Sequence, residues 1–254
     1  MLTSPGRRLA ARLALGIALA LVVLGSAACS GGGFFRQYEY EEEVYLSLDG
    51  SATVYVNASI PALVALRGFS LDLSPTAKPD TAAVKTAYTG PGAHVTRVST
   101  SRRSGRRFVH VRLDVDDIRR LSEVAPFAWS TYRFSKDEGL YVYKQTIGAA
   151  AGKAVGDVGW NGSEAVEVRL HLPSKITFHN TKPDNLKRGN ILVWEQSLTD
   201  RLQGQPLAID ARMETQSILY HTLYLFGATF LVVAVLFILV IWWVARRGKG
   251  TPEA

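Results

Sequence analysis

The strongest constraint on this chain is an uncharged apolar run close to its C-terminus. From Leu223 to Ala245 the sequence contains no Asp, Glu, Lys or Arg. At ~1.5 Å per residue a helix over this run is about 34 Å long, enough to cross the hydrocarbon core of a bilayer. Tyr224 and Trp242 lie near its two ends, where amphipathic rings favour the headgroup level. We therefore predict a transmembrane helix over 223–245.

Basic residues follow this run directly and set the expected topology. Arg246, Arg247 and Lys249 lie in the short segment 246–254. Because positive charge beside a span is retained on the cytoplasmic side, this segment is expected to be a cytoplasmic tail. Everything before the span is then presented on the outer side of the cytoplasmic membrane.

The N-terminus has the pattern of a secretory signal peptide, predicted over residues 1–28. Arg7, Arg8 and Arg12 form a basic start, and a short apolar stretch, 13–24, follows. Small residues then precede Cys29. This order of basic, apolar and small-residue segments directs export.

The only cysteine of the chain, Cys29, lies at the expected cleavage point. The segment 24–29 resembles the lipobox of bacterial lipoproteins, although Ser26 stands where that pattern usually has Leu. The resemblance implies cleavage before Cys29 and lipidation of this residue. Ordinary cleavage after Ala28 and an uncleaved anchor are the alternatives. Residues 29–36 include three consecutive glycines and are expected to be a flexible tether.

Net charge excludes one class of partner. The chain carries a formal charge of +7, but much of the excess lies in the signal peptide and the tail. The exported region, 37–216, is left with a small net charge, so no nucleic-acid partner is expected. It contains no cysteine either, which means that its stability must come from a hydrophobic core.

The exported region is predicted to be one α+β domain with a largely antiparallel sheet of hairpins and two or three short helices. Apolar and polar residues alternate over several short runs, which is typical of half-buried strands. Hairpins are predicted around Asp49-Gly50, around Ser104-Gly105 and over 129–147, the last with a five-residue turn. Short helices are expected after Ser59, Asp80 and Asp116, residues that favour N-caps. Residues 148–159 are expected to be a mobile loop.

Several segments resemble the exported domain of LppM-like bacterial lipoproteins. They are the opening run 48–54, the segment 108–121 with its acidic Asp114 to Asp117, and the late pair 168–176 and 189–195. The resemblance implies an envelope protein with an α+β domain that is lipid-anchored or membrane-spanning. It supplies no catalytic residues, and it suggests a role at envelope lipids only loosely.

The sequence contains no motif that predicts catalysis, a metal site or a cofactor. No histidine pair has the HExxH spacing of a zinc hydrolase, and no G-x-S-x-G is present. His110 and His171 are expected on the exposed side of strands. The acidic run Glu41 to Glu43 is expected at a solvated sheet edge, because alternation along a strand separates its middle carboxylate from the other two.

The candidate binding residues are four arginines around a predicted hairpin turn, namely Arg102, Arg103, Arg106 and Arg107. The forked guanidinium group suits phosphate, so this arginine tip could contact lipid headgroups or an anionic polymer. The alternative is a solvated turn that discourages edge-to-edge aggregation.

We expect a non-enzymatic envelope protein that serves as a membrane-anchored binding module, without a cofactor. The expected partners are the membrane and either an anionic lipid or another envelope protein. The alternatives are a subunit of a membrane protein assembly and an enzyme that acts on an envelope polymer.

Overall fold

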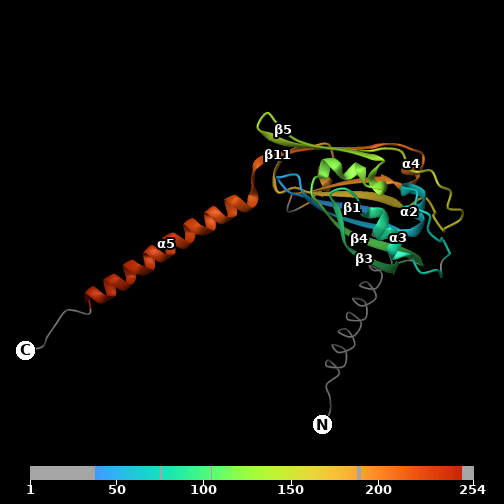
Figure 1. Ribbon diagram of the computed structural model, residues 1–254. Coiled ribbons are helices and arrows are strands. Elements are labelled where there is room, and N and C mark those ends of the chain that lie inside the picture. The colour runs from blue at the N-terminus through green and yellow to red at the C-terminus, as the bar shows by residue number, and fades with distance from the viewer. Residues whose placement is uncertain (1–37, 75, 104, 188–189, 248–254) are drawn as a thin grey trace, which may run out of the picture. The chain divides into compact units, whose positions relative to one another are not determined.

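The computed structural model describes residues 38–247, except 75, 104, 188 and 189. The predicted signal peptide, Cys29 and the tether lie outside the described residues, and so does the tail after Arg247. The described part forms two β-sheets with short helices, followed by one long C-terminal helix (Figure 1).

A seven-stranded sheet provides the larger layer of the domain. Its strand order is β3-β4-β2-β1-β7-β10-β9. These strands are β1 (Tyr38–Leu46), β2 (Ala52–Ser59), β3 (Ala93–Arg103), β4 (Arg106–Val115), β7 (Ala165–His171), β9 (Leu186–Lys187) and β10 (Ile191–Ser197). Neighbouring strands are antiparallel except β1 and β7, which run parallel at the centre of the sheet. The predicted α+β class with largely antiparallel pairing is confirmed.

A four-stranded antiparallel sheet, in the order β5-β6-β11-β8, packs against the first one. Its strands are β5 (Ser130–Asp137), β6 (Leu140–Ile147), β8 (Ser174–His179) and β11 (Leu207–Ser217). Apolar side chains from both sheets join in one core cluster, to which the larger sheet contributes Val54 and Leu170 and the smaller one Tyr143 and Ile209. Burial of these faces supplies the main driving force for folding.

Most of the short helices in the described residues begin after a residue whose side chain caps the first turn. They are α2 (Ile60–Arg67), α3 (Thr81–Tyr88), α4 (Leu198–Leu202), η1 (Ile118–Glu123), η2 (Ala125–Phe127) and η3 (Pro183–Asn185). The predicted N-caps Ser59 and Asp80 are confirmed, since each side chain accepts a hydrogen bond from the first turn. At the third site the cap is Asp117 rather than the predicted Asp116, because Asp117 Oδ1 accepts the backbone N–H of Arg119.

All three predicted hairpins form, but the turn of the third is tighter than expected. β5 ends at Asp137 and β6 begins at Leu140, so only Glu138 and Gly139 connect them. Both have positive φ, 46° and 81°. This geometry belongs to the two-residue turns that match the twist of antiparallel strands.

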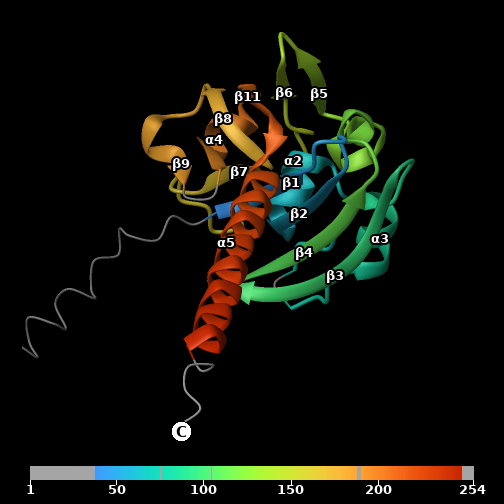
Figure 2. The ribbon, with the colours of Figure 1, turned by 90° about the vertical axis from the view of Figure 1, so that its left-hand side faces the viewer.

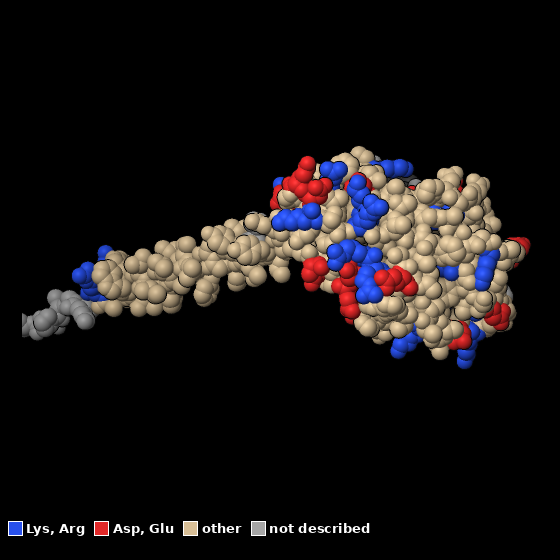
Figure 3. Space-filling model, turned by 45° about the horizontal axis from the view of Figure 1, so that its top comes forward, with Lys and Arg blue, Asp and Glu red and all other residues tan. Residues whose placement is uncertain are grey.

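The C-terminal helix α5 (Ile218–Arg247) follows β11 without an intervening residue. It is 30 residues long, and its most apolar stretch of 18 residues has a mean hydropathy of 2.8. The helix contains the predicted span 223–245. Figure 3 shows uncharged atoms along the helix up to its basic end. By length and composition, this helix could cross a membrane.

Candidate functional site

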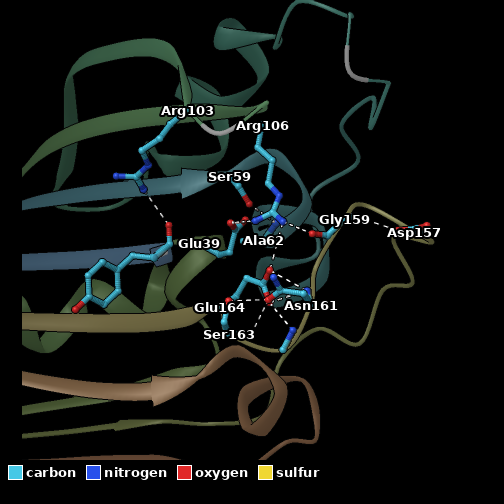
Figure 4. A network of polar contacts seen from close by, with 12 residues as sticks. Glu39, Ser59, Ala62, Arg103, Arg106, Asp157, Gly159, Asn161, Ser163 and Glu164 are labelled. Atoms are coloured by element: carbon cyan, nitrogen blue, oxygen red, sulfur yellow. Dashed lines mark hydrogen bonds and ion pairs between the residues drawn. The ribbon is translucent and has the colours of Figure 1, made fainter. Parts of the chain in front are cut away.

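The predicted arginine tip is the turn between β3 and β4, where Gly105 adopts a positive φ of 75°. Arg106 points back into the domain, and its side chain is only 13% exposed. Its guanidinium forms ion pairs with Glu39 and Glu164, the latter at 3.3 Å, and donates to the carbonyl of Gly159 (Figure 4). Arg106 therefore binds the loop before β7 to the start of β1.

Two further arginines of the tip also donate hydrogen bonds to backbone carbonyls. Arg107 donates to Asp72 O at 2.7 Å and to Ala77 O. Arg103 donates to Tyr38 O at 2.9 Å and lies over the Phe108 ring, 4.4 Å from its centroid. Arg102 is exposed. Arg106 and Arg107 are therefore engaged within the domain, whereas residues 102, 103 and 105 are exposed. Both the contact of the tip with phosphate and the alternative of a solvated turn stay predictions.

The environment of Glu164 explains how Arg106 is held in place. Burial alone would raise the pKa of the Glu164 carboxyl group. The backbone N–H groups of Asn161 and Gly162 and the charge of Arg106 outweigh burial, and the pKa lies below its usual value. Glu164 thus stays ionised and pairs with the guanidinium.

The acidic run was predicted at a solvated edge, and this is wrong. β1 is the central strand of its sheet, so Glu42 is fully buried beneath it. Its carboxylate accepts hydrogen bonds from Gln145 (2.9 Å), Tyr40 (3.0 Å) and Tyr132 (3.5 Å), and pairs with Arg67 at 3.4 Å. This network connects both sheets and α2, which is a structural role.

The two strand histidines are less exposed than predicted, because each is hydrogen-bonded to neighbouring strands. His110 lies 2.8 Å from Asn57 Oδ1 and 2.7 Å from Ser101 Oγ. His171 stacks on Tyr45, with ring centroids 3.8 Å apart, and its Nε2 lies 2.6 Å from Glu43 Oε1. Among the described residues, no group of three His, Cys, Asp or Glu side chains could hold a metal ion.

A polar hollow, which sequence reasoning missed, lies at the opposite end of the seven-stranded sheet from the arginine tip. Its volume is about 480 Å³. The walls come from the ends of β1, β2, β4 and β7, and include Tyr45, Ser47, Ser51, Thr53, Asp114, Asp116, His171 and Pro173. Hydroxyl, carboxylate and aromatic groups from four strands meet here.

The aromatic wall of the polar hollow is fixed by hydrogen bonds. Tyr45 is 41% exposed, and its hydroxyl donates to Glu43 at 3.2 Å. The hydrogen bond from His171 lowers the pKa of the Glu43 carboxyl group, against the opposing effect of burial. On the other wall, Thr53 donates to Asp114 at 3.0 Å. These contacts hold two walls of the hollow in place.

The polar hollow lies beside the start of α5. Pro173, which lines it, accepts hydrogen bonds from the Ile218 N–H (3.1 Å) and from Ser217 Oγ (3.3 Å). The arginine tip lies about 30 Å away along β4, nine residues at ~3.3 Å each. The hollow could be recognised only once the pairing of the strands was known, since residues 45, 114 and 171 belong to strands far apart in the sequence.

Comparison with solved structures gives a distant structural likeness. The chain resembles the folded domain of the LppM protein of Mycobacterium tuberculosis, determined by NMR, with a TM-score of 0.39 and 12% identity over 72% of this chain and 94% of that chain. No protein-family model and no curated protein matches the chain. The structural relationship is distant, so membership of the LppM-like family stays a prediction.

Proposed function

We propose that this chain is a non-enzymatic envelope protein that holds an α+β binding module at the outer face of the cytoplasmic membrane. The observation that carries this proposal is the junction between β11 and α5. An apolar helix of membrane-spanning length begins directly after the last strand, and its first N–H is bonded to Pro173. The domain is thereby kept close to the point where the chain enters the membrane.

The polar hollow is the best candidate for ligand binding because it opens beside this junction. Its ligand is an envelope component, either a lipid headgroup or a segment of another envelope protein. Tyr45 offers an exposed ring, and Asp114 and Asp116 offer carboxylate acceptors. A ligand with hydroxyl or amino groups matches these acceptors.

Topology is tested first, with a reporter that is active only in the cytoplasm, fused after Ala254. An active reporter is expected because Arg246 and Arg247 follow the span. An inactive fusion, alongside an active reporter of exported domains at the same position, contradicts the proposed orientation. Intact-mass measurement of the mature protein then distinguishes acylated Cys29 from the alternatives.

Ligand binding is tested by extracting the full chain in mild detergent and identifying bound lipids and proteins by mass spectrometry. Three forms are compared: wild type, Tyr45→Ala and Trp129→Ala. Tyr45 and Trp129 are equally exposed, 41% each, but only Tyr45 lines the polar hollow. A component that is lost with Tyr45→Ala and kept with Trp129→Ala supports the proposal. The same set in all three forms refutes it.

A further inference from the structure

One flank of the domain is formed by the edge strands of both sheets. β8 is the edge of the four-stranded sheet and β9 that of the seven-stranded sheet. The segment between them is held to β10, since Trp194 Nε1 donates to Asn180 Oδ1 at 2.9 Å and Thr181 Oγ1 donates to Val193 O. We call residues 174–187 the β8–β9 flank; Figure 2 shows the two strands on the same side of the domain.

This flank presents large apolar side chains to solvent. Phe178 is 45% exposed and Leu186 is 46% exposed. In the described part of the domain before α5, the other large apolar side chains of comparable exposure are Tyr45, Trp129 and Leu202. Single exposed apolar residues need no explanation. Two exposed apolar side chains on one flank, close to a membrane-spanning helix, do need an explanation.

The same flank is basic. Lys175, Lys182 and Lys187 are exposed along it. The side chain of Lys175 is 73% exposed, although its Nζ also pairs with Glu214 of β11 at 3.2 Å. Arg212 of β11 lies over the Phe178 ring, 5.1 Å from its centroid. Apolar side chains beside lysines and arginines are the pattern of surfaces that rest in the membrane interface, with the rings at the acyl boundary and the cations at anionic headgroups.

Strand pairing places this flank next to the membrane entry point. Ser174 is the partner of Ser217, the last residue before α5. Phe178 is the partner of Arg212, five residues earlier along β11. At ~3.3 Å per residue, Phe178 lies about 17 Å from the junction. The flank begins at the point where α5 begins, whereas the arginine tip is at the far end of the larger sheet.

We propose that the β8–β9 flank rests on the surface of the bilayer that α5 spans, with Phe178 and Leu186 in the interface and the three lysines against anionic phospholipid headgroups. The proposal rests on the membrane-spanning role of α5 in the proposed function. It is independent of the ligand of the polar hollow. It also makes this flank, rather than the arginine tip, the main lipid contact of the domain.

The test uses the full chain in nanodiscs of phosphatidylcholine with a minority of phosphatidylglycerol. The photoreactive amino acid benzoylphenylalanine replaces Phe178, and lipid adducts are measured by mass spectrometry. The matched control replaces Trp129, an exposed aromatic residue just before β5, at the opposite edge of the same sheet. A third form replaces Phe230 within α5 and reports insertion of the helix alone.

The proposal expects lipid adducts at positions 178 and 230 and few at position 129. Adducts at 230 with none at 178, or equal yields at 178 and 129, overturn it and leave the anchoring intact. No adducts at 230 contradict the membrane span itself, and with it both proposals. The failures of the two proposals are therefore distinguishable.

The electrostatic part of the proposal is tested with the label at position 178. Lys175, Lys182 and Lys187 are replaced together by Ser, and the control replaces the exposed lysines Lys78, Lys85 and Lys136. The ratio of docked to free domain should fall about fivefold for each flank lysine at low salt. The control triple variant, and omission of phosphatidylglycerol for the flank variant, should change it little. Equal effects of the two triple variants overturn the headgroup contact.

Discussion

The two ends of the seven-stranded sheet differ in two respects: how clearly the sequence marks them as candidate sites, and how many polar groups they leave available to a ligand. The arginine tip carries four arginines in six residues, yet Arg106 and Arg107 are used within the domain to hold carboxylates and backbone carbonyls. The other end has no dense motif, yet four strands bring Tyr45, Asp114 and His171 together around an open hollow. Charge density along a sequence therefore does not measure the chemistry that a surface offers to a ligand.

The sharpest way to break this comparison is to remove Arg106. Arg106→Ala would leave Glu39 and Glu164 in a buried site without their cation. Removing one partner of a buried ion pair typically costs about 3–5 kcal/mol. We expect a loss of this size in the unfolding free energy of the full chain in mild detergent, measured by near-ultraviolet circular dichroism in denaturant. Arg102→Ala, on the exposed side of the tip, is the control and should cost much less. Equal losses of unfolding free energy in the two variants would mean that burial does not distinguish Arg106 from the exposed Arg102.

At the other end, the expected loss is smaller. His171→Ala removes both the hydrogen bond to Glu43 and the stack on Tyr45, which together should cost about 2 kcal/mol. His171→Phe restores a ring for stacking but not the hydrogen bond, and should recover part of the loss. The same unfolding measurement applies. If Phe and Ala are equally costly, the stack does not stabilise the wall of the hollow.

Arg103 provides an intermediate case within the tip. It is exposed, and it contributes one hydrogen bond to Tyr38 O and a cation–π contact with Phe108. Arg103→Ala should destabilise the domain by about 1 kcal/mol. Arg103→Lys keeps the charge and should lose less. A loss as large as that of Arg106→Ala would show that exposure does not separate the arginines of the tip.

The smallest effect concerns acid pH. The pKa of Glu43 is lowered in the folded domain, chiefly by the hydrogen bond from His171. A carboxyl group with a lowered folded-state pKa adds stability above its unfolded-state pKa, and this contribution is lost as the pH falls through the folded-state pKa. The difference in unfolding free energy between wild type and Glu43→Gln should therefore shrink as the pH falls below 4.5, the ordinary pKa of a glutamate side chain. A constant difference from neutral to acid pH would contradict the assignment.

Local signals predicted much of the fold. Ser59 and Asp80 were recognisable as caps because their side chains can satisfy free N–H groups of the first helical turn. The hairpin at Asp49-Gly50 and the alternating strands were recognisable for similar local reasons. The apolar run at 223–245 predicted its helix because no other element accommodates it.

Pairing between distant strands could not be predicted in this way. Nothing in residues 38–46 indicates that β1 runs parallel to β7, and this pairing is what buries Glu42 and places Tyr45 beside His171. The polar hollow and the β8–β9 flank both depend on such pairings. The arginine tip was located correctly as a turn, but its carboxylate partners come from positions 39 and 164, far away in the sequence.

The position of β11 has a consequence for how the protein is made. β11 lies between β6 and β8, so the smaller sheet stays divided until this strand is present. It is also the last strand before α5. During synthesis the smaller sheet cannot close until β11 is complete at residue 217, and α5 is the segment that follows directly. Completion of the sheet and synthesis of the apolar helix are therefore consecutive events, and a chain truncated before β11 lacks both.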